Sequence, residues 1–84
     1  MVYLIHFTVR YKHAGHYLGS ADDLEARLER HRQGNGARLM QVIAEHGITW
    51  RLARTWEGGR ELERKLKNRH NSPRLCPICN KKGA

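Results

Sequence analysis

The chain has 84 residues, which suffices for one compact domain and excludes a second independent core. Hydrophobic residues make up 39% and charged residues 29%, the usage of a globular protein, so a disordered chain is excluded. The formal net charge of +8 favours a polyanionic partner, and nucleic acid comes ahead of an anionic membrane surface. No apolar run approaches the roughly 20 residues that span a bilayer, and no signal peptide is visible, so we expect a cytoplasmic protein that does not enter a membrane.

The first elements in the chain are predicted to be two antiparallel strands. Residues 2–10 (VYLIHFTVR) are rich in β-branched and aromatic residues and are apolar on both faces in their first half, which predicts a central strand. Residues 11–15 have the composition of a turn. Residues 16–19 (HYLG) then predict a second strand, which forms a hairpin with the first.

A helix is expected next, with Ser20 as its N-cap in the sequence Ser-Ala-Asp-Asp. Leu24, Leu28 and His31 recur at i, i+4 and i+7 and predict an inward-facing stripe. Gly34-Asn35-Gly36 ends this helix.

The remaining elements alternate between helical and strand patterns. Residues 37–46 predict a short amphipathic helix, and Gly47 suits its left-handed closing position. Residues 48–57 alternate with period two, which places Ile48, Trp50 and Leu52 on one buried face of a strand. Residues 60–70 return to a helical pattern.

These elements predict an α+β fold of order β-β-α-α-β-α, in which a small three-stranded antiparallel sheet is flanked by helices. We assign residues 1–71 to the domain and residues 72–84 to a short, basic C-terminal tail that contains the sequence Cys-Pro-Ile-Cys.

Four sequence motifs in this order carry a specific resemblance. They are Val2-Tyr3 in the first strand, Tyr17-Leu18-Gly19 in the second, Arg27 with His31 in the first helix, and Leu62-Glu63 with Leu66 in the last helix. Their order and spacing resemble the GIY-YIG endonuclease superfamily over residues 2 to 67. The chain departs from the pattern at Met1, where the family has Gly, and Asn71 and Asn80 are imperfect matches to the Asn that follows the family's last helix.

The resemblance implies a metal-dependent endonuclease that hydrolyses phosphodiester bonds in DNA, single- or double-stranded. It implies that Glu63 holds Mg²⁺ or Mn²⁺, that Arg27 clamps the phosphate, and that Tyr3 or Tyr17 is the general base, with His31 as its partner. The chemistry is consistent with this set, because hydrolysis needs an activated water and neutralisation of the phosphate charge. One active site per chain predicts a monomer that nicks one strand, or a weak homodimer.

Spacing alone favours simpler roles for two of these residues. Arg27 lies four residues after Asp23, and Glu63 lies four residues before Lys67, which is the pattern of ordinary ion pairs on a solvated helix face. The tyrosines would then be half-buried sheet residues. Only the order of the motifs favours the catalytic interpretation.

Five further cations are predicted to bind nucleic acid: Arg30, Arg38, Arg51, Arg54 and Lys67. Trp50 and Trp56 are candidates for stacking on bases, although a place in the core is favoured for Trp50 and equally consistent for Trp56.

Cys76 and Cys79 resemble half of a zinc ribbon, and His70 or His46 are candidates to complete a Zn²⁺ site. The alternative function is therefore a non-catalytic nucleic-acid-binding module with a zinc-ribbon-like tail.

Overall fold

The computed structural model describes residues 1–12, 14–34, 37–68 and 75–79. Its six elements are β1 (Val2–Tyr11), β2 (Ala14–Ser20), α1 (Leu24–Arg32), α2 (Arg38–Glu45), β3 (Trp50–Trp56) and α3 (Arg60–Asn68). This order confirms the predicted α+β fold with a three-stranded antiparallel sheet. Within the described residues, the helices are too short and too polar to cross a membrane.

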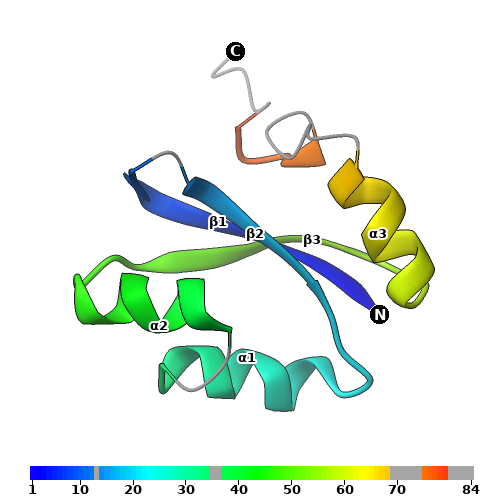
Figure 1. Ribbon diagram of the computed structural model, residues 1–84, viewed down its shortest axis with the longest axis horizontal. Coiled ribbons are helices and arrows are strands. Elements are labelled where there is room, and N and C mark those ends of the chain that lie inside the picture. Colours follow the sequence, from blue (N-terminus) through cyan, green and yellow to red (C-terminus); the bar gives the residue numbers. More distant parts are fainter. Residues whose placement is uncertain (13, 35–36, 69–74, 80–84) are drawn as a thin grey trace.

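The strands lie in the order β2-β1-β3, and β1 pairs antiparallel with both neighbours. The central place of β1 confirms the prediction from its two apolar faces. Helices α1 and α2 cover one face of the sheet and α3 covers the other (Figure 1). Alternate residues of β1 therefore supply two separate cores.

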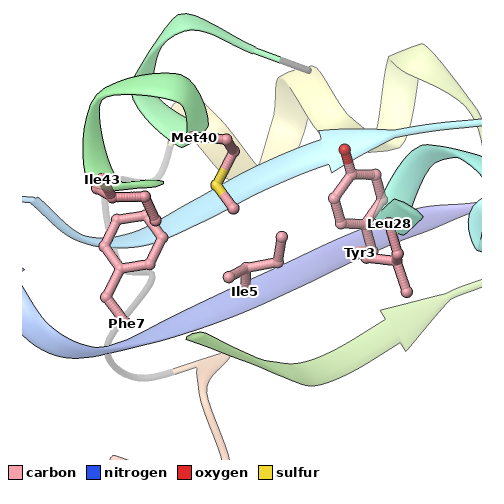
Figure 2. Packing of buried hydrophobic residues seen from close by; sticks show 6 residues of the cluster. All are labelled: Tyr3, Ile5, Phe7, Leu28, Met40 and Ile43. Carbon is pink, nitrogen blue, oxygen red and sulfur yellow. The ribbon is translucent and has the colours of Figure 1, made fainter. Parts of the chain in front are cut away.

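The first core lies between the sheet and the pair α1 and α2 (Figure 2). The predicted inward stripe of α1 supplies Leu28. The predicted apolar face of α2 supplies two more side chains, and Gly47 closes that helix with a φ of 69°, as expected. The buried members of this core are Tyr3, Ile5, Phe7, Leu28, Met40 and Ile43.

The second core lies under α3 and includes part of the predicted tail. Its buried members are Val2, Leu4, Leu18, Leu66 and Cys76. Leu75 and Ile78 are partly buried against the same group, so residues 75–79 pack onto the domain. The predicted boundary between residues 71 and 72 lies outside the described residues and stays a prediction.

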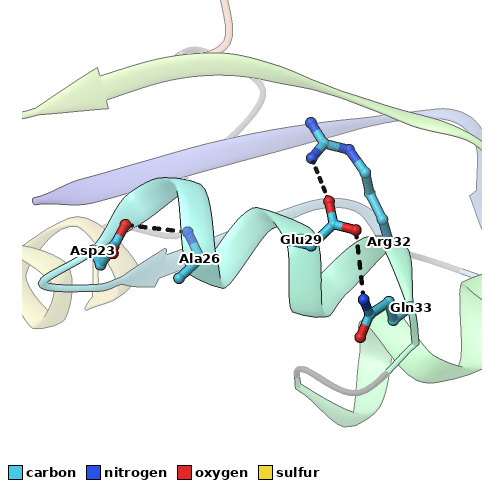
Figure 3. A network of polar contacts seen from close by, with 5 residues as sticks. All are labelled: Asp23, Ala26, Glu29, Arg32 and Gln33. Atoms are coloured by element: carbon cyan, nitrogen blue, oxygen red, sulfur yellow. Dashed lines mark hydrogen bonds and ion pairs between the residues drawn. The ribbon is translucent and has the colours of Figure 1, made fainter.

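The prediction that Ser20 caps α1 is wrong. Ser20 is the last residue of β2 and pairs with Val2, because the ladder between β1 and β2 continues to that point. The N-cap is Asp23, whose carboxylate accepts a hydrogen bond of 3.1 Å from the amide of Ala26 (Figure 3). Asp23 has an extended backbone, as an N-cap requires.

The expected burial of Leu52 is also wrong, since 40% of this residue is exposed. Leu52 lies opposite Ile5, on the side of the first core, but β3 is an edge strand and Leu52 lines a hollow there. Next to it the ladder is irregular: Ile5 pairs with Leu52 and Leu4 with Arg54, which leaves Ala53 as an extra residue. Beyond this bulge Trp56 packs against the second core, whereas Trp50 packs against the first.

Candidate active site

Two tyrosines and a histidine contact one another in the first core. Tyr3 is fully buried, and its hydroxyl lies 2.7 Å from Nε2 of His31 on α1. The centroid of the Tyr17 ring lies 6.0 Å from that of Tyr3 and 5.4 Å from that of His31. Tyr17 pairs with Ile5, two residues along β1 from Tyr3, so both tyrosines project from the same face of the sheet.

Gly19 makes room for this group. It lies opposite Tyr3 in the ladder, and a Cβ atom there would come within 2.8 Å of the Tyr3 hydroxyl and 2.9 Å of the Tyr17 ring. Contacts this close do not occur between real side chains, so a larger residue would displace one of the two tyrosines. The close approach of the two tyrosines thus explains why the Tyr-Leu-Gly motif ends in glycine.

Burial and charge set the protonation of this group. Burial raises the pKa of Tyr3, the neighbouring Tyr17 raises it further, and the Arg27 charge opposes both. Burial, together with Arg27, lowers the pKa of His31 and keeps its ring neutral at physiological pH. The Nδ1 atom of His31 is buried and has no hydrogen-bond partner among the residues that the structure describes.

Glu63 lies on α3, at the other face of the sheet, and its carboxylate is held from two sides. The Ser20 hydroxyl donates to Oε1 at 2.6 Å, and the Lys67 ammonium lies 2.8 Å from Oε2. Burial by itself would raise the pKa of Glu63, but the hydrogen bonds from Lys67 and Ser20 and the nearby positive charges together lower it. Glu63 is therefore ionised, with 20% of its side chain exposed.

Arg27 connects the two groups. It lines a hollow of about 120 Å³ together with Ser20, which also binds Glu63, and with Arg60. The charge of Arg27 lowers the pKa of Tyr3, and the charge of Glu63 raises it. The structure thus brings Tyr3, Tyr17 and His31 into contact and places Arg27 and Glu63 at their side, while the catalytic roles of all five stay predictions.

Three polar residues near Glu63 were not recognised in the sequence: Ser20, Arg60 and Arg64. Arg60 and Arg64 line a hollow of about 360 Å³ with Glu63 and Lys67, and α3 places all four side by side. Arg60 lies three residues before Glu63 and four before Arg64, and this helical spacing was a signal that could have found the two arginines. Ser20 could not be found, because its partner lies 43 residues away.

A further hollow, of about 330 Å³, is lined by Arg27 and Arg30 and adjoins the one between Arg27 and Arg60. Arg27 lines two of these hollows and Arg60 lines two, so the three make up one row of neighbouring hollows between α1 and α3, in which Glu63 lies. We call it the basic groove, and its cations are Arg27, Arg30, Arg60, Arg64 and Lys67.

Of the five predicted nucleic-acid-binding cations, Arg30 and Lys67 line the basic groove. Arg38 is exposed at the start of α2, and Arg51 and Arg54 are exposed on β3. The Arg54 guanidinium lies 4.7 Å from the centroid of the Trp56 ring. A larger hollow of about 500 Å³ lies beside β3 and is lined in part by His31 and Trp50, and none of the residues that line it is a carboxylate.

A second group of polar side chains has the composition of a metal site. His6, His16, Cys76 and Cys79 place one ligand atom each within 4.8 Å of the others. Of the histidines considered from the sequence, His46 instead packs on the ring of Tyr11, at 4.8 Å between centroids, and His70 lies outside the described residues. Asn71 and Asn80 lie outside them as well.

This α+β domain is strongly basic and holds an ionised carboxylate among arginines. These features are typical of proteins that process nucleic acids, because arginines bind phosphate and a carboxylate can hold a metal ion. The sequence model of the GIY-YIG catalytic domain matches residues 1–75. The chain therefore belongs to the GIY-YIG family, which implies nuclease activity, a nucleic acid substrate and the use of a divalent metal. No match was found among curated proteins or among solved structures.

Proposed function

We propose that this protein is an endonuclease that hydrolyses phosphodiester bonds in DNA with Mg²⁺ or Mn²⁺. The observation that supports this most is the position of Glu63, an ionised carboxylate in a hollow whose other charged groups are Arg60, Arg64 and Lys67. Asp22 and Asp23 line the groove only at its α1 end. Family membership supports the reaction class.

The residues at Glu63 fit a hard divalent cation. The carboxylate offers oxygen ligands, it is ionised, and its exposed part faces the groove, where phosphates would lie. A bound Mg²⁺ or Mn²⁺ would supply an activated water and neutralise charge on the phosphate. Ser20 would keep the carboxylate oriented, and Lys67 is free to turn from Glu63 towards a DNA phosphate.

Arg27 is proposed to stabilise the charge that grows on the phosphate during hydrolysis. Its guanidinium is permanently charged and can bind two phosphate oxygens at once. Arg27 lines a hollow together with Arg60 and with Ser20, the hydrogen-bond partner of Glu63. A phosphate bound at Arg27 would therefore also contact Arg60. This pair of arginines would hold the scissile group next to the carboxylate.

The general base is proposed to be Tyr3. Tyr17 is the more exposed of the two tyrosines, but Tyr3 is the one whose hydroxyl contacts His31 and whose ionisation responds to both Arg27 and Glu63. Burial raises the pKa of Tyr3 and so favours the protonated hydroxyl. The hydroxyl can therefore accept a proton from water only if it gives its own proton to another group. The water O–H bond breaks as the Tyr3 oxygen takes that proton, and the proton of Tyr3 moves to Nε2 of neutral His31.

The decisive experiment compares cleavage of labelled single- and double-stranded DNA by the native chain and by Glu63→Gln, with Mg²⁺ or Mn²⁺ at matched salt. We expect the substitution to lower the cleavage rate by about 100-fold or more, because it removes the charge of the metal-binding carboxylate. Glu61→Gln is the matched control, since Glu61 is exposed on the same helix, and it should cut like the native chain.

Equal cleavage by Glu63→Gln and the native chain would exclude the proposed role of this carboxylate. If neither protein cuts DNA and both bind it with the same salt dependence, the domain is a binding module and the proposed activity is wrong.

A further inference from the structure

His6 on β1 and His16 on β2 lie directly opposite each other in the sheet. They are partners in the ladder between β1 and β2, so their side chains project from the same face, and their ring centroids lie 5.2 Å apart. This is the face that carries Val2, Leu4 and the second core. The segment with Cys76 and Cys79 packs against that core.

Nitrogen and sulfur atoms from these four residues converge on one point. His6 Nδ1 lies 3.4 Å from His16 Nε2 and 3.4 Å from the sulfur of Cys76. The sulfur of Cys79 lies 3.2 Å from His16 Nε2 and 3.5 Å from His6 Nδ1. The four ligand atoms thus form one compact group, all within 4.8 Å of one another.

These distances match a tetrahedral zinc site. Zinc bonds of about 2.3 Å to sulfur and about 2.05 Å to nitrogen, at tetrahedral angles, separate nitrogen from sulfur by about 3.6 Å and two nitrogens by about 3.3 Å. The observed separations of 3.2–3.5 Å and 3.4 Å lie close to both values. Two thiolates, two imidazoles and no carboxylate make a soft ligand set, which favours zinc over magnesium or calcium.

We propose that His6, His16, Cys76 and Cys79 bind a structural Zn²⁺ that fastens the segment after α3 to the central sheet. Two thiolates cancel the two charges of the ion, which suits a site that is partly buried, with Cys76 fully inside. All four positions are filled by protein, as in structural rather than catalytic zinc sites.

The zinc site would also help to fix the position of Glu63. It would anchor the chain just after α3, while Leu66 and Leu62 hold the helix against the same core. In a domain of 84 residues the cores are small, so a metal link is an effective means of fixing one helix against a sheet. The zinc is separate from the divalent metal proposed at Glu63 and does not depend on the nuclease proposal.

Zinc content tests the proposal directly. The full chain is purified without chelator, dialysed exhaustively and analysed by atomic emission, and we expect about one zinc per chain. His16→Ala and Cys79→Ser should each weaken zinc binding by more than about 100-fold, because each removes one of four ligands. His46→Ala is the matched control, since the His46 ring packs on Tyr11 and should leave the zinc content unchanged.

A second measurement uses only the native chain, so it tests the proposal even if the variants do not fold. The zinc-free native chain is titrated with Co²⁺, whose visible and near-ultraviolet absorption reports thiolate ligands in a tetrahedral site. We expect saturation at about one Co²⁺ per chain and displacement by Zn²⁺. Absence of zinc together with absence of thiolate absorption would overturn the proposal, and so would full zinc binding by both His16→Ala and Cys79→Ser.

The test is distinct from that of the nuclease activity. Glu63→Gln should keep its zinc even where it no longer cuts DNA, because Glu63 is not one of the four ligands. Loss of zinc on Glu63→Gln would show that the two sites are one, against the proposal.

Discussion

Tyr3 contributes an apolar ring to the core and a polar hydroxyl to a hydrogen bond. Its ring fills the first core beside Leu28 (Figure 2). Its hydroxyl lies 2.7 Å from Nε2 of His31, which is the partner that a buried hydroxyl needs. Gly19 leaves the space in which that hydroxyl sits.

Replacing the two tyrosines separately distinguishes their roles. Tyr3→Phe should lower the single-turnover cleavage rate by about 10²- to 10⁴-fold, because it removes the hydroxyl that contacts His31 and that we propose passes a proton to it. Tyr17→Phe should have a smaller effect, and Tyr11→Phe, at the far end of β1, is the control. DNA binding by all three should stay close to native. A larger loss in Tyr17→Phe than in Tyr3→Phe would assign the base to Tyr17 instead.

At the scale of elements, the short connection between β2 and α1 decides how the site is assembled. The strand continues through Ser20, which presents its hydroxyl to Glu63, and the helix begins only after Asp23. Had Ser20 capped the helix, its hydroxyl would have been used by α1 and could not have oriented the carboxylate. Separate residues therefore cap the helix and orient Glu63.

The cap of α1 gives a stability prediction. Asp23→Ala should lower the free energy of unfolding by about 1 kcal/mol, because it leaves the Ala26 amide without its acceptor and removes a negative charge from the helix N-terminus. Urea denaturation followed by circular dichroism measures the change. Asp22→Ala is the control, since this neighbour is also exposed and is not the cap. An equal or larger loss for Asp22→Ala would contradict the assignment of the cap.

At the scale of the whole molecule, the net charge is +8, and five of the cations line the hollows of the basic groove, one of which Glu63 also lines. A polyanion attracted by the overall field would find its lowest energy where cations are closest together. This supports the groove as the path of the DNA backbone, with Glu63 at its wall.

Salt dependence of DNA binding tests the groove. Arg64→Ala should weaken binding and reduce the slope of log K against log salt by about 1, because one phosphate contact is lost. Arg38→Ala removes an equal charge on α2, outside the groove, and should leave the slope close to native. Fluorescence anisotropy at several salt concentrations gives both slopes. An equal reduction by Arg38→Ala would show that DNA also contacts α2, as the sequence pattern by itself suggested.

The sequence by itself determined the order of the elements, the central place of β1, the inward stripes of α1 and α2, and the family. These features follow from local patterns, because a strand or helix buries one face according to a period of two or 3.6 residues. It also indicated Tyr3, Tyr17, Arg27, His31 and Glu63, since motif order identifies residues without knowledge of their contacts.

Only the tertiary structure decided which residues meet. The bond from Ser20 to Glu63, the contact of Tyr3 with His31, and the approach of His6 and His16 to Cys76 and Cys79 join positions 28 to 73 residues apart. Local patterns carry no information on such distances, because the pairing of strands and the packing of helices over them set which side chains converge. The sequence therefore indicated half of the proposed metal site in the two cysteines, and the fold brought the two histidines to them.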